Sequence, residues 1–204
     1  AGPTHEYIDP IRYISNKSSG KQGFELAKSL KNNGFETTLI TGPTNLEPIL
    51  DINLIKVNSA KEMFDATLEN LPTDVAIFSA AVSDWKIQNI EREKIKKEKN
   101  INLKLEKNMD ILDYVSKHNS LRPKIVIGFA AETNNLNENS KKKLSQKNCD
   151  WIIANDVSNP SIGFGSDFNE VTIFYKNKEH EKIAKIKKSL LAEKIVERVI
   201  SQIN

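Results

Sequence analysis

Short apolar segments alternate with longer segments of helical periodicity along most of this chain. Six apolar runs predict strands, and the third, fourth and fifth are apolar at consecutive positions, which is typical of strands buried on both faces of a sheet. Five longer segments carry apolar residues at the spacing of one helix face. This alternation predicts an α/β fold with a mostly parallel sheet and helices on both faces. The predicted strands are residues 37–41, 53–57, 74–81, 125–131, 150–154 and 171–175, and the predicted helices are residues 23–33, 60–71, 109–118, 136–148 and 189–203.

Two charged segments interrupt the alternation. Residues 91–100 hold five basic and three acidic side chains, and Leu103 and Leu105 then alternate with charged residues. We expect an exposed strand or hairpin there, so that about residues 85–107 form an arm that projects from the sheet. Residues 176–194 hold seven basic and three acidic side chains, which predicts a solvated turn followed by a helix face.

The composition indicates one globular domain over residues 1–204. Hydrophobic residues make up 38% of the chain, enough for a core, and 30 basic against 27 acidic residues give a net charge of +3, too small and mixed to indicate nucleic acid. No apolar run is long enough for a membrane span, and the first residues do not form a signal peptide. A lone cysteine, Cys149, favours a reducing, cytoplasmic setting. The absence of an initiator Met fits a domain cut from a longer polypeptide.

Candidate ligand-binding residues follow three of the predicted strands. In an open parallel sheet, ligands bind beyond the carboxyl ends of the strands. Small residues followed by polar ones occur there in residues 81–85, 130–134 and 155–158. Each segment could be a plain connection, but the three together favour a binding site.

A polar turn near the N-terminus predicts a phosphate site. Residues 15–23 place Ser18, Ser19 and Gly20 directly before a predicted helix, and exposed N–H groups at a helix start suit phosphate. The turn is not a Walker A loop, because Gln22 stands where that loop needs Ser or Thr. A Gly-x-Gly-x-x-Gly fingerprint for NAD does not occur.

A series of motifs spans the chain from residue 1 to about residue 171. The motifs are AGPTHE at 1–6, IDPIRYISN at 8–16, SSGK at 18–21, AAVSDW at 80–85, KIKK at 94–97, KNMDIL at 107–112, GFAAET at 128–133, ANDV at 154–157, GFGSD at 163–167 and NEV at 169–171. As an ordered set, they resemble those of bacterial phosphopantothenoylcysteine synthetase, the phosphopantothenate–cysteine ligase of coenzyme A biosynthesis.

The resemblance implies a Rossmann-like, homodimeric ligase that uses CTP with Mg²⁺. In bacteria it commonly forms the C-terminal half of a bifunctional protein, whose N-terminal half is an FMN-dependent phosphopantothenoylcysteine decarboxylase. In such proteins a strand precedes the Ala-Gly-Pro-Thr turn. The carboxylate of 4'-phosphopantothenate attacks the α-phosphate of CTP, giving an acyl-cytidylate and pyrophosphate. The amine of L-cysteine then displaces CMP to form the amide.

The resemblance also assigns roles to single residues. Lys94, on a mobile flap, would face the charge that develops on phosphate, and the amide of Asn16 would donate to the acyl oxygen in the second step. Asp84 would bind the nucleotide or hold Mg²⁺ on the triphosphate. On the residues alone, Lys94 is better explained as a solvated surface lysine. Asn16 could be a helix-entry or left-handed turn residue, and Asp84 could be a turn residue. The predicted nucleotide-binding residues are Phe78, Ser79, Ala80, Asp84, Lys94, Met109, Asp110, Ile111, Leu112, Phe129, Lys143 and Lys147. The residues predicted to bind phosphopantothenate or phosphate are Asn16, Ser18, Ser19 and Gly20.

Two other functions fit parts of the pattern. A Rossmann-like nucleotide-binding oxidoreductase would use the same sheet, but the dinucleotide fingerprint is missing. An RNA-binding module would use residues 141–143 and 91–100, but these basic stretches have no interleaved aromatics. Met109 stands where the ligase family usually has Pro, which leaves the choice between CTP and ATP open. No histidine has metal-ligand spacing, and Cys149 is expected to be a packing residue.

Overall fold

The protein is described by a computed structural model that covers residues 1–97, 102–158, 163 and 165–203. Its largest sheet has five strands in the order β11-β10-β9-β8-β5, of which β5, β8 and β9 are mutually parallel and β10 and β11 are antiparallel to their neighbours. The strands are β5 (Val75–Phe78), β8 (Ile125–Glu132), β9 (Trp151–Asp156), β10 (Phe168–Tyr175) and β11 (Glu181–Lys187). The three consecutively apolar runs are therefore confirmed as the parallel strands.

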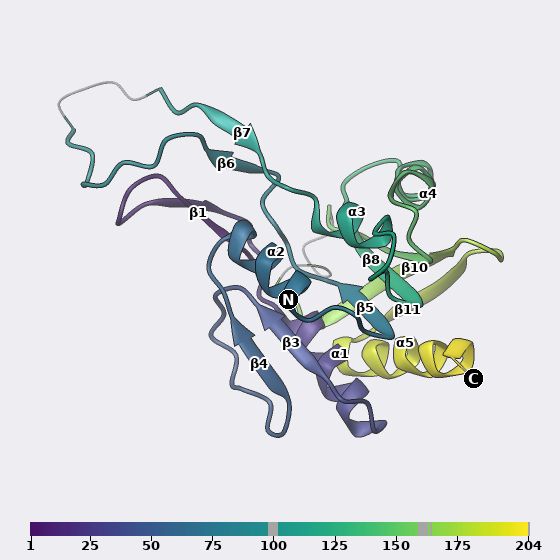
Figure 1. The fold of residues 1–204 in the computed structure, drawn as a ribbon. Coiled ribbons are helices and arrows are strands. Elements are labelled where there is room, and N and C mark those ends of the chain that lie inside the picture. Colours follow the sequence, from purple (N-terminus) through teal and green to yellow (C-terminus); the bar gives the residue numbers. More distant parts are fainter. Residues whose placement is uncertain (98–101, 159–162, 164, 204) are drawn as a thin grey trace.

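Helices cover both faces of this sheet (Figure 1). The helices are α1 (Lys21–Asn32), α2 (Ala60–Glu69), α3 (Ile111–Ser116), α4 (Leu136–Lys147) and α5 (Lys188–Ile203). Because successive residues of a strand point to opposite faces, Ile127 and Trp151 pack with Leu191 of α5, whereas Ile152 packs with Leu144 of α4. Among the described residues, no helix is long and apolar enough to cross a membrane.

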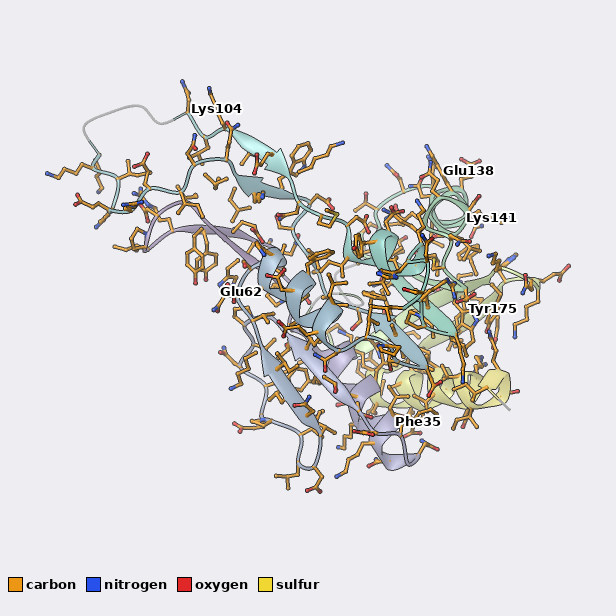
Figure 2. All side chains as sticks on the ribbon, in the orientation of Figure 1. Phe35, Glu62, Lys104, Glu138, Lys141 and Tyr175 are labelled. Atoms are coloured by element: carbon orange, nitrogen blue, oxygen red, sulfur yellow. The ribbon has the colours of Figure 1, made fainter. Side chains whose placement is uncertain are left out.

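Three small strand pairs surround the central sheet. β3 (Thr38–Thr41) and β4 (Asn53–Lys56) are parallel and form a sheet of their own. The pairs β1 (His5–Tyr7) with β2 (Tyr13–Ser15) and β6 (Trp85–Ile87) with β7 (Leu105–Lys107) are antiparallel. Both pairs project from the body of the molecule (Figure 1), and Lys104 points away from it in Figure 2. The predicted arm is thus confirmed, although its residues 98–101 lie outside the described residues.

Two elements differ from the prediction. The segment 176–194 contains strand β11 in place of a solvated turn, because Ile183 is buried against the central sheet while its lysines face outward. Lysines of this kind are common on edge strands, where they discourage pairing with other chains. The hairpin of β1 and β2 was not predicted at all, since its strands have only three residues each.

The N-terminal segment connects β3 of the small parallel sheet with β5 of the central sheet. The carbonyl oxygen of Ala1 accepts from the N–H of Gly42 after β3 (3.0 Å), and that of Gly2 accepts from the N–H of Ala81 after β5 (2.9 Å). Gly42 must be glycine, because a Cβ there would lie 1.6 Å from the carbonyl oxygen of Pro3. The carboxyl ends of β3 and β5 are therefore joined through residues 1–3.

Candidate active site

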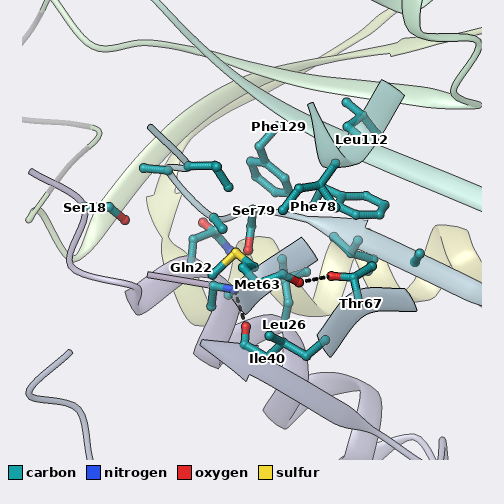
Figure 3. A pocket seen from close by; sticks show the side chains of 18 of the residues that line it. Ser18, Gln22, Leu26, Ile40, Met63, Thr67, Phe78, Ser79, Leu112 and Phe129 are labelled. Carbon is teal, nitrogen blue, oxygen red and sulfur yellow. Dashed lines mark hydrogen bonds between the residues drawn. The ribbon is translucent and has the colours of Figure 1, made fainter. Parts of the chain in front are cut away.

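A cavity of about 1380 Å³ opens beyond the carboxyl ends of β5 and β8 and continues between β3 and β5. Its inner part is apolar and includes Leu26, Ile40 and Met63, whereas Ser18 and Ser79 lie at its polar side (Figure 3). Every residue predicted for the site lines this cavity except Lys94. The fold thus gathers residues from the polar turn, from two strand ends and from α4.

The polar turn opens α1 at one side of the cavity. Gly20 precedes the helix with φ +77°, a left-handed conformation that favours glycine, and its N–H donates to Ser18 Oγ (3.3 Å). The helix start has no side-chain cap and no acidic residue in its first turn. Such a start presents donors and the positive end of the helix dipole, an arrangement that suits phosphate.

The loop after β5 is fixed from two sides. Asn16 Nδ2 donates to the carbonyl oxygen of Ala81 (3.0 Å), and the N–H of Ser83 donates to Oγ1 of the fully buried Thr4 (3.0 Å). Asn16 is exposed and lines the cavity, so its amide lies beside the small residues that follow β5. The amide is placed to reach a ligand bound over this loop.

Asp84 ends the same loop and contacts the segment that precedes α3. Its carbonyl oxygen accepts from the N–H of Asn108 (2.9 Å), and Asn108 Nδ2 donates to the carbonyl oxygen of Ser83 (2.9 Å). The Asp84 side chain is exposed at the cavity. Within the described residues, no group of three His, Cys, Asp or Glu residues could hold a metal ion. A lone carboxylate fits Mg²⁺ carried by nucleotide phosphates rather than an all-protein metal site.

The two lysines of α4 face the cavity but are paired with carboxylates. Lys143 Nζ lies 2.7 Å from Oε1 of Glu132, which ends β8 and is only 9% exposed. Lys147 forms an ion pair with Asp110, which also caps α3 by accepting from the N–H of Asp113 (2.8 Å). The predicted i, i+4 arrangement on one helix face is present, and each cation has a counter-ion.

Apolar side chains of β5, β8 and α3 form one wall of the cavity. Phe78, Phe129 and Leu112 lie together on this side of the cavity (Figure 3). Gly128 lets Leu112 approach β8, because a Cβ on Gly128 would lie 2.5 Å from Leu112 Cδ2. Flat aromatic and aliphatic surfaces of this kind suit a nucleobase.

Lys94 lies on the projecting arm, exposed and outside the cavity lining. Its neighbour Ile95 is held by the hairpin of β1 and β2: the N–H of Ile95 donates to Oδ2 of Asp9 (3.1 Å), and the Arg12 guanidinium donates to the carbonyl oxygen of Ile95 (2.9 Å). The hydrogen bond from Arg12 holds the pKa of Asp9 far below its usual range. The loop is therefore anchored one residue beyond Lys94.

Sequence reasoning missed two polar residues of the site, Asn169 and Lys188, the first residue of α5. Both are buried and line the cavity, as does Asn155, which belongs to the segment 155–158 that the strand-end argument named. No sequence signal indicated Lys188, which lies in a lysine-rich stretch that resembles solvated surface.

Comparisons with known proteins agree with this geometry. Residues 1–203 match the family described as the DNA/pantothenate metabolism flavoprotein C-terminal domain. The coenzyme A biosynthesis bifunctional protein CoaBC of Haemophilus influenzae is 44% identical over 204 residues, which cover 99% of this chain and 50% of that protein. The chain spans about half the length of the curated relatives it matches.

Solved structures show the same fold. The crystal structure of the C-terminal domain of a CoaBC protein has a TM-score of 0.83 and 34% identity, covering 100% of this chain and 92% of the other. A DNA/pantothenate metabolism flavoprotein from Streptococcus pneumoniae has a TM-score of 0.82 and 25% identity, with coverage of 99% and 96%. None of these relatives supports the oxidoreductase alternative. With its fold, its cavity and the match over residues 1–203, this chain belongs to the DNA/pantothenate metabolism flavoprotein C-terminal domain family.

Proposed function

We propose that this domain is a phosphopantothenate–cysteine ligase that condenses 4'-phosphopantothenate with L-cysteine through an acyl-cytidylate formed from CTP. The observation that carries the proposal is that one cavity at the carboxyl ends of the strands is lined by every predicted nucleotide and phosphate residue except Lys94. The relationship to CoaBC proteins, whose names state a role in coenzyme A biosynthesis, supports the same reaction.

In the first step, the substrate carboxylate attacks the α-phosphate of CTP and pyrophosphate leaves. The start of α1, with Ser18, Ser19 and Gly20, would donate to phosphate oxygens, and Lys143 and Lys147 would exchange their carboxylate partners for phosphates. Asp84 would hold Mg²⁺, which neutralises charge on the triphosphate. The side chains of Phe78 and Phe129 would contact the base, and the backbone of residues 109–112 would recognise it through its polar groups.

In the second step, the amine of L-cysteine attacks the acyl carbon, CMP leaves with the bonding electron pair, and the amine releases a proton. Asn16 lies beside the loop after β5, with its Nδ2 on the carbonyl oxygen of Ala81. We assign it to donate to the acyl oxygen as that oxygen gains negative charge. A donor of this type typically contributes about 10²–10³ to the rate.

Lys94 would reach the phosphates only through movement of the arm or through a second copy of the chain. The two hairpins expose apolar side chains, with Ile11 60% and Ile90 61% exposed. Exposed apolar patches of this kind indicate a protein contact, so we propose a homodimer formed through the hairpins. Ile90→Asp should then give a monomer in light scattering, whereas Leu50→Asp, at a site 79% exposed near β4, should leave the dimer intact.

We also propose that residues 1–204 form one domain of a longer bifunctional polypeptide with an FMN-dependent decarboxylase domain upstream. The names of the relatives and their twofold greater length support this arrangement.

The test is pyrophosphate release from CTP with Mg²⁺ and 4'-phosphopantothenate, first without cysteine. We expect one equivalent of pyrophosphate per site, followed by turnover when L-cysteine is added, and little release with ATP. Asn16→Ala should keep the burst and lose about 10²–10³ of the turnover, whereas Asn32→Ala, exposed at the end of α1, should behave as the unaltered protein. Release that does not depend on 4'-phosphopantothenate, or no release with either nucleotide, would refute the ligase proposal.

A further inference from the structure

The starts of two helices meet at the edge of the cavity. α1 begins at Lys21 and α5 begins at Lys188, and Gln22 Nε2 donates to the carbonyl oxygen of Lys188 (3.3 Å). Figure 1 shows the two helices side by side beneath the central sheet. Neither helix has an acidic residue in its first turn. Two positive dipole ends therefore face one region with no helix-borne carboxylate to offset them.

Two lysines add positive charge to this region, and only Lys21 is paired with a carboxylate among the described residues. Lys21 Nζ binds Oδ1 of Asp167 (2.5 Å) and donates to the carbonyl oxygen of Gly165 (3.2 Å). Lys188 Nζ donates to the carbonyl oxygen of Gly163 (2.8 Å), a neutral acceptor. Within the described residues, no carboxylate forms an ion pair with Lys188. The side chain of Asp167 is 74% exposed, so water screens its charge.

Lys188 is also the most deeply buried cation of the cavity, with 6% of its surface exposed. Burial, followed by the charge of Lys21, lowers the pKa of Lys188 to about 8. Burying an ammonium group without a carboxylate is unfavourable unless another anion compensates it. A core packing role does not require this charge, since a methionine would fill the same volume.

A buried polar atom with no partner lies in the same place. Gln22 Oε1 is buried and accepts no hydrogen bond from the described residues, and Gln22 points into the cavity in Figure 3. Buried polar atoms normally have partners. A ligand that brings both a phosphate group and a hydroxyl group would satisfy Lys188 and this oxygen together.

We propose that Lys188, with Lys21 and the starts of α1 and α5, forms a phosphate-binding subsite for a ligand of the cavity. The inference rests on the proposed function, because the phosphate is then either the 4'-phosphate of phosphopantothenate or the terminal phosphates of CTP. Lys188 and Lys21 bond Gly163, Gly165 and Asp167, whereas the lysines of α4 pair with Glu132 and Asp110. The subsite therefore uses other cations than those already assigned to the nucleotide.

The test compares ligands with and without the phosphate group by titration calorimetry. Lys188→Met keeps an unbranched side chain of similar volume and removes its charge. Lys187→Met is the matched control, because Lys187 is its exposed neighbour and does not line the cavity. If the subsite binds the phosphate of the acid substrate, Lys188→Met weakens the binding of 4'-phosphopantothenate by about 10- to 100-fold and leaves the affinity for pantothenate unchanged. If the source is the nucleotide, the same loss appears for CTP and not for CMP.

A second variant should change the affinity for the phosphate-bearing ligand in the opposite direction. Asp167→Asn removes the carboxylate that competes for Lys21, so the phosphate-bearing ligand should bind about 2- to 5-fold more tightly.

Inorganic pyrophosphate provides a probe that does not depend on the ligase reaction: it should bind the unaltered protein and bind Lys188→Met more weakly. If pyrophosphate shows this difference while the substrates do not bind, the ligase proposal fails and the subsite stands. Equal affinities of Lys188→Met and Lys187→Met for all phosphate-bearing ligands would overturn the subsite.

Discussion

Gly20→Ala provides a sharp test of the geometry at the start of α1. Gly20 has φ +77°, and an added Cβ would lie 2.8 Å from Thr44 Cγ2. Gly34, after the other end of the same helix, has φ +84° with nothing within 4 Å of the added Cβ, and it does not line the cavity. The two glycines therefore share the backbone requirement and differ in packing and in function.

The expected losses of stability follow from this difference. A left-handed conformation costs a non-glycine residue about 1–2 kcal/mol, and the lower entropy of the unfolded chain returns about 0.4–1 kcal/mol. Gly34→Ala should therefore lower the free energy of unfolding by about 1 kcal/mol. Gly20→Ala should lose about 1–3 kcal/mol more, because the new methyl group is forced against Thr44. Thr44→Ser removes Cγ2 and should restore that packing part but not the backbone part.

Urea unfolding measures the stability, and calorimetric titration with CTP measures the function. We expect Gly20→Ala to weaken CTP by about 10-fold, because the N–H groups at the helix start shift with the strained turn, and Gly34→Ala to bind CTP normally. The reasoning fails if both variants lose equal stability, or if Gly34→Ala weakens CTP as much as Gly20→Ala does.

Three further predictions concern single side chains. Lys147→Met should weaken the binding of CTP by about tenfold or less, because the lysine must first leave Asp110. In the same calorimetric titration, Lys141→Met should bind CTP normally, because Lys141 is an exposed residue of α4 outside the cavity lining (Figure 2). Burial raises the pKa of Cys149 to about 11, so iodoacetamide should alkylate it only as urea unfolds the protein, and stoichiometric labelling of the folded protein would contradict this. Burial, followed by its hydrogen bond to Glu181, raises the pKa of Tyr175 from 10.0 to about 12. Because the unfolded state loses this proton first, the free energy of unfolding should fall as the pH rises from 10 to 12. The free energy of unfolding of Tyr175→Phe should fall less over the same range.

The fold could be predicted wherever hydrophobicity has a clear period. Runs of apolar residues identified β5, β8 and β9, because both faces of β8 and β9 are buried and those of β5 are partly buried, so no polar residue interrupts the pattern. β11 escaped prediction because it is an edge strand: Ile183 is buried, but exposed lysines dominate its composition. Its place beside β10 is decided by tertiary pairing, which a local pattern does not contain.

The site was predictable where it follows from topology. Parallel strands bring their carboxyl ends to one edge, so Ser79 and Asp84, which follow β5, meet Phe129 of β8 at the cavity although Phe129 is far from both in sequence. Lys94 could not be placed in this way, because it lies on an arm whose position depends on Asp9 and on any partner chain. The carboxylate partners of the α4 lysines could not be predicted either. The spacing of the lysines shows that they share one helix face, but it does not show which residues lie opposite that face.

Those carboxylates determine which cation should contribute most to phosphate binding. Lys143 and Lys147 already have carboxylate partners, Glu132 and Asp110, so a phosphate that binds them replaces one anion by another. The net gain from such an exchange is small where water screens the pair. Lys188 is buried and bonded to a neutral carbonyl, so a phosphate there adds the counter-ion that the protein lacks. Lys188→Met should therefore weaken its phosphate-bearing ligand more than Lys147→Met weakens CTP, and the reverse order would mean that the carboxylate pairs do not persist in the unliganded protein.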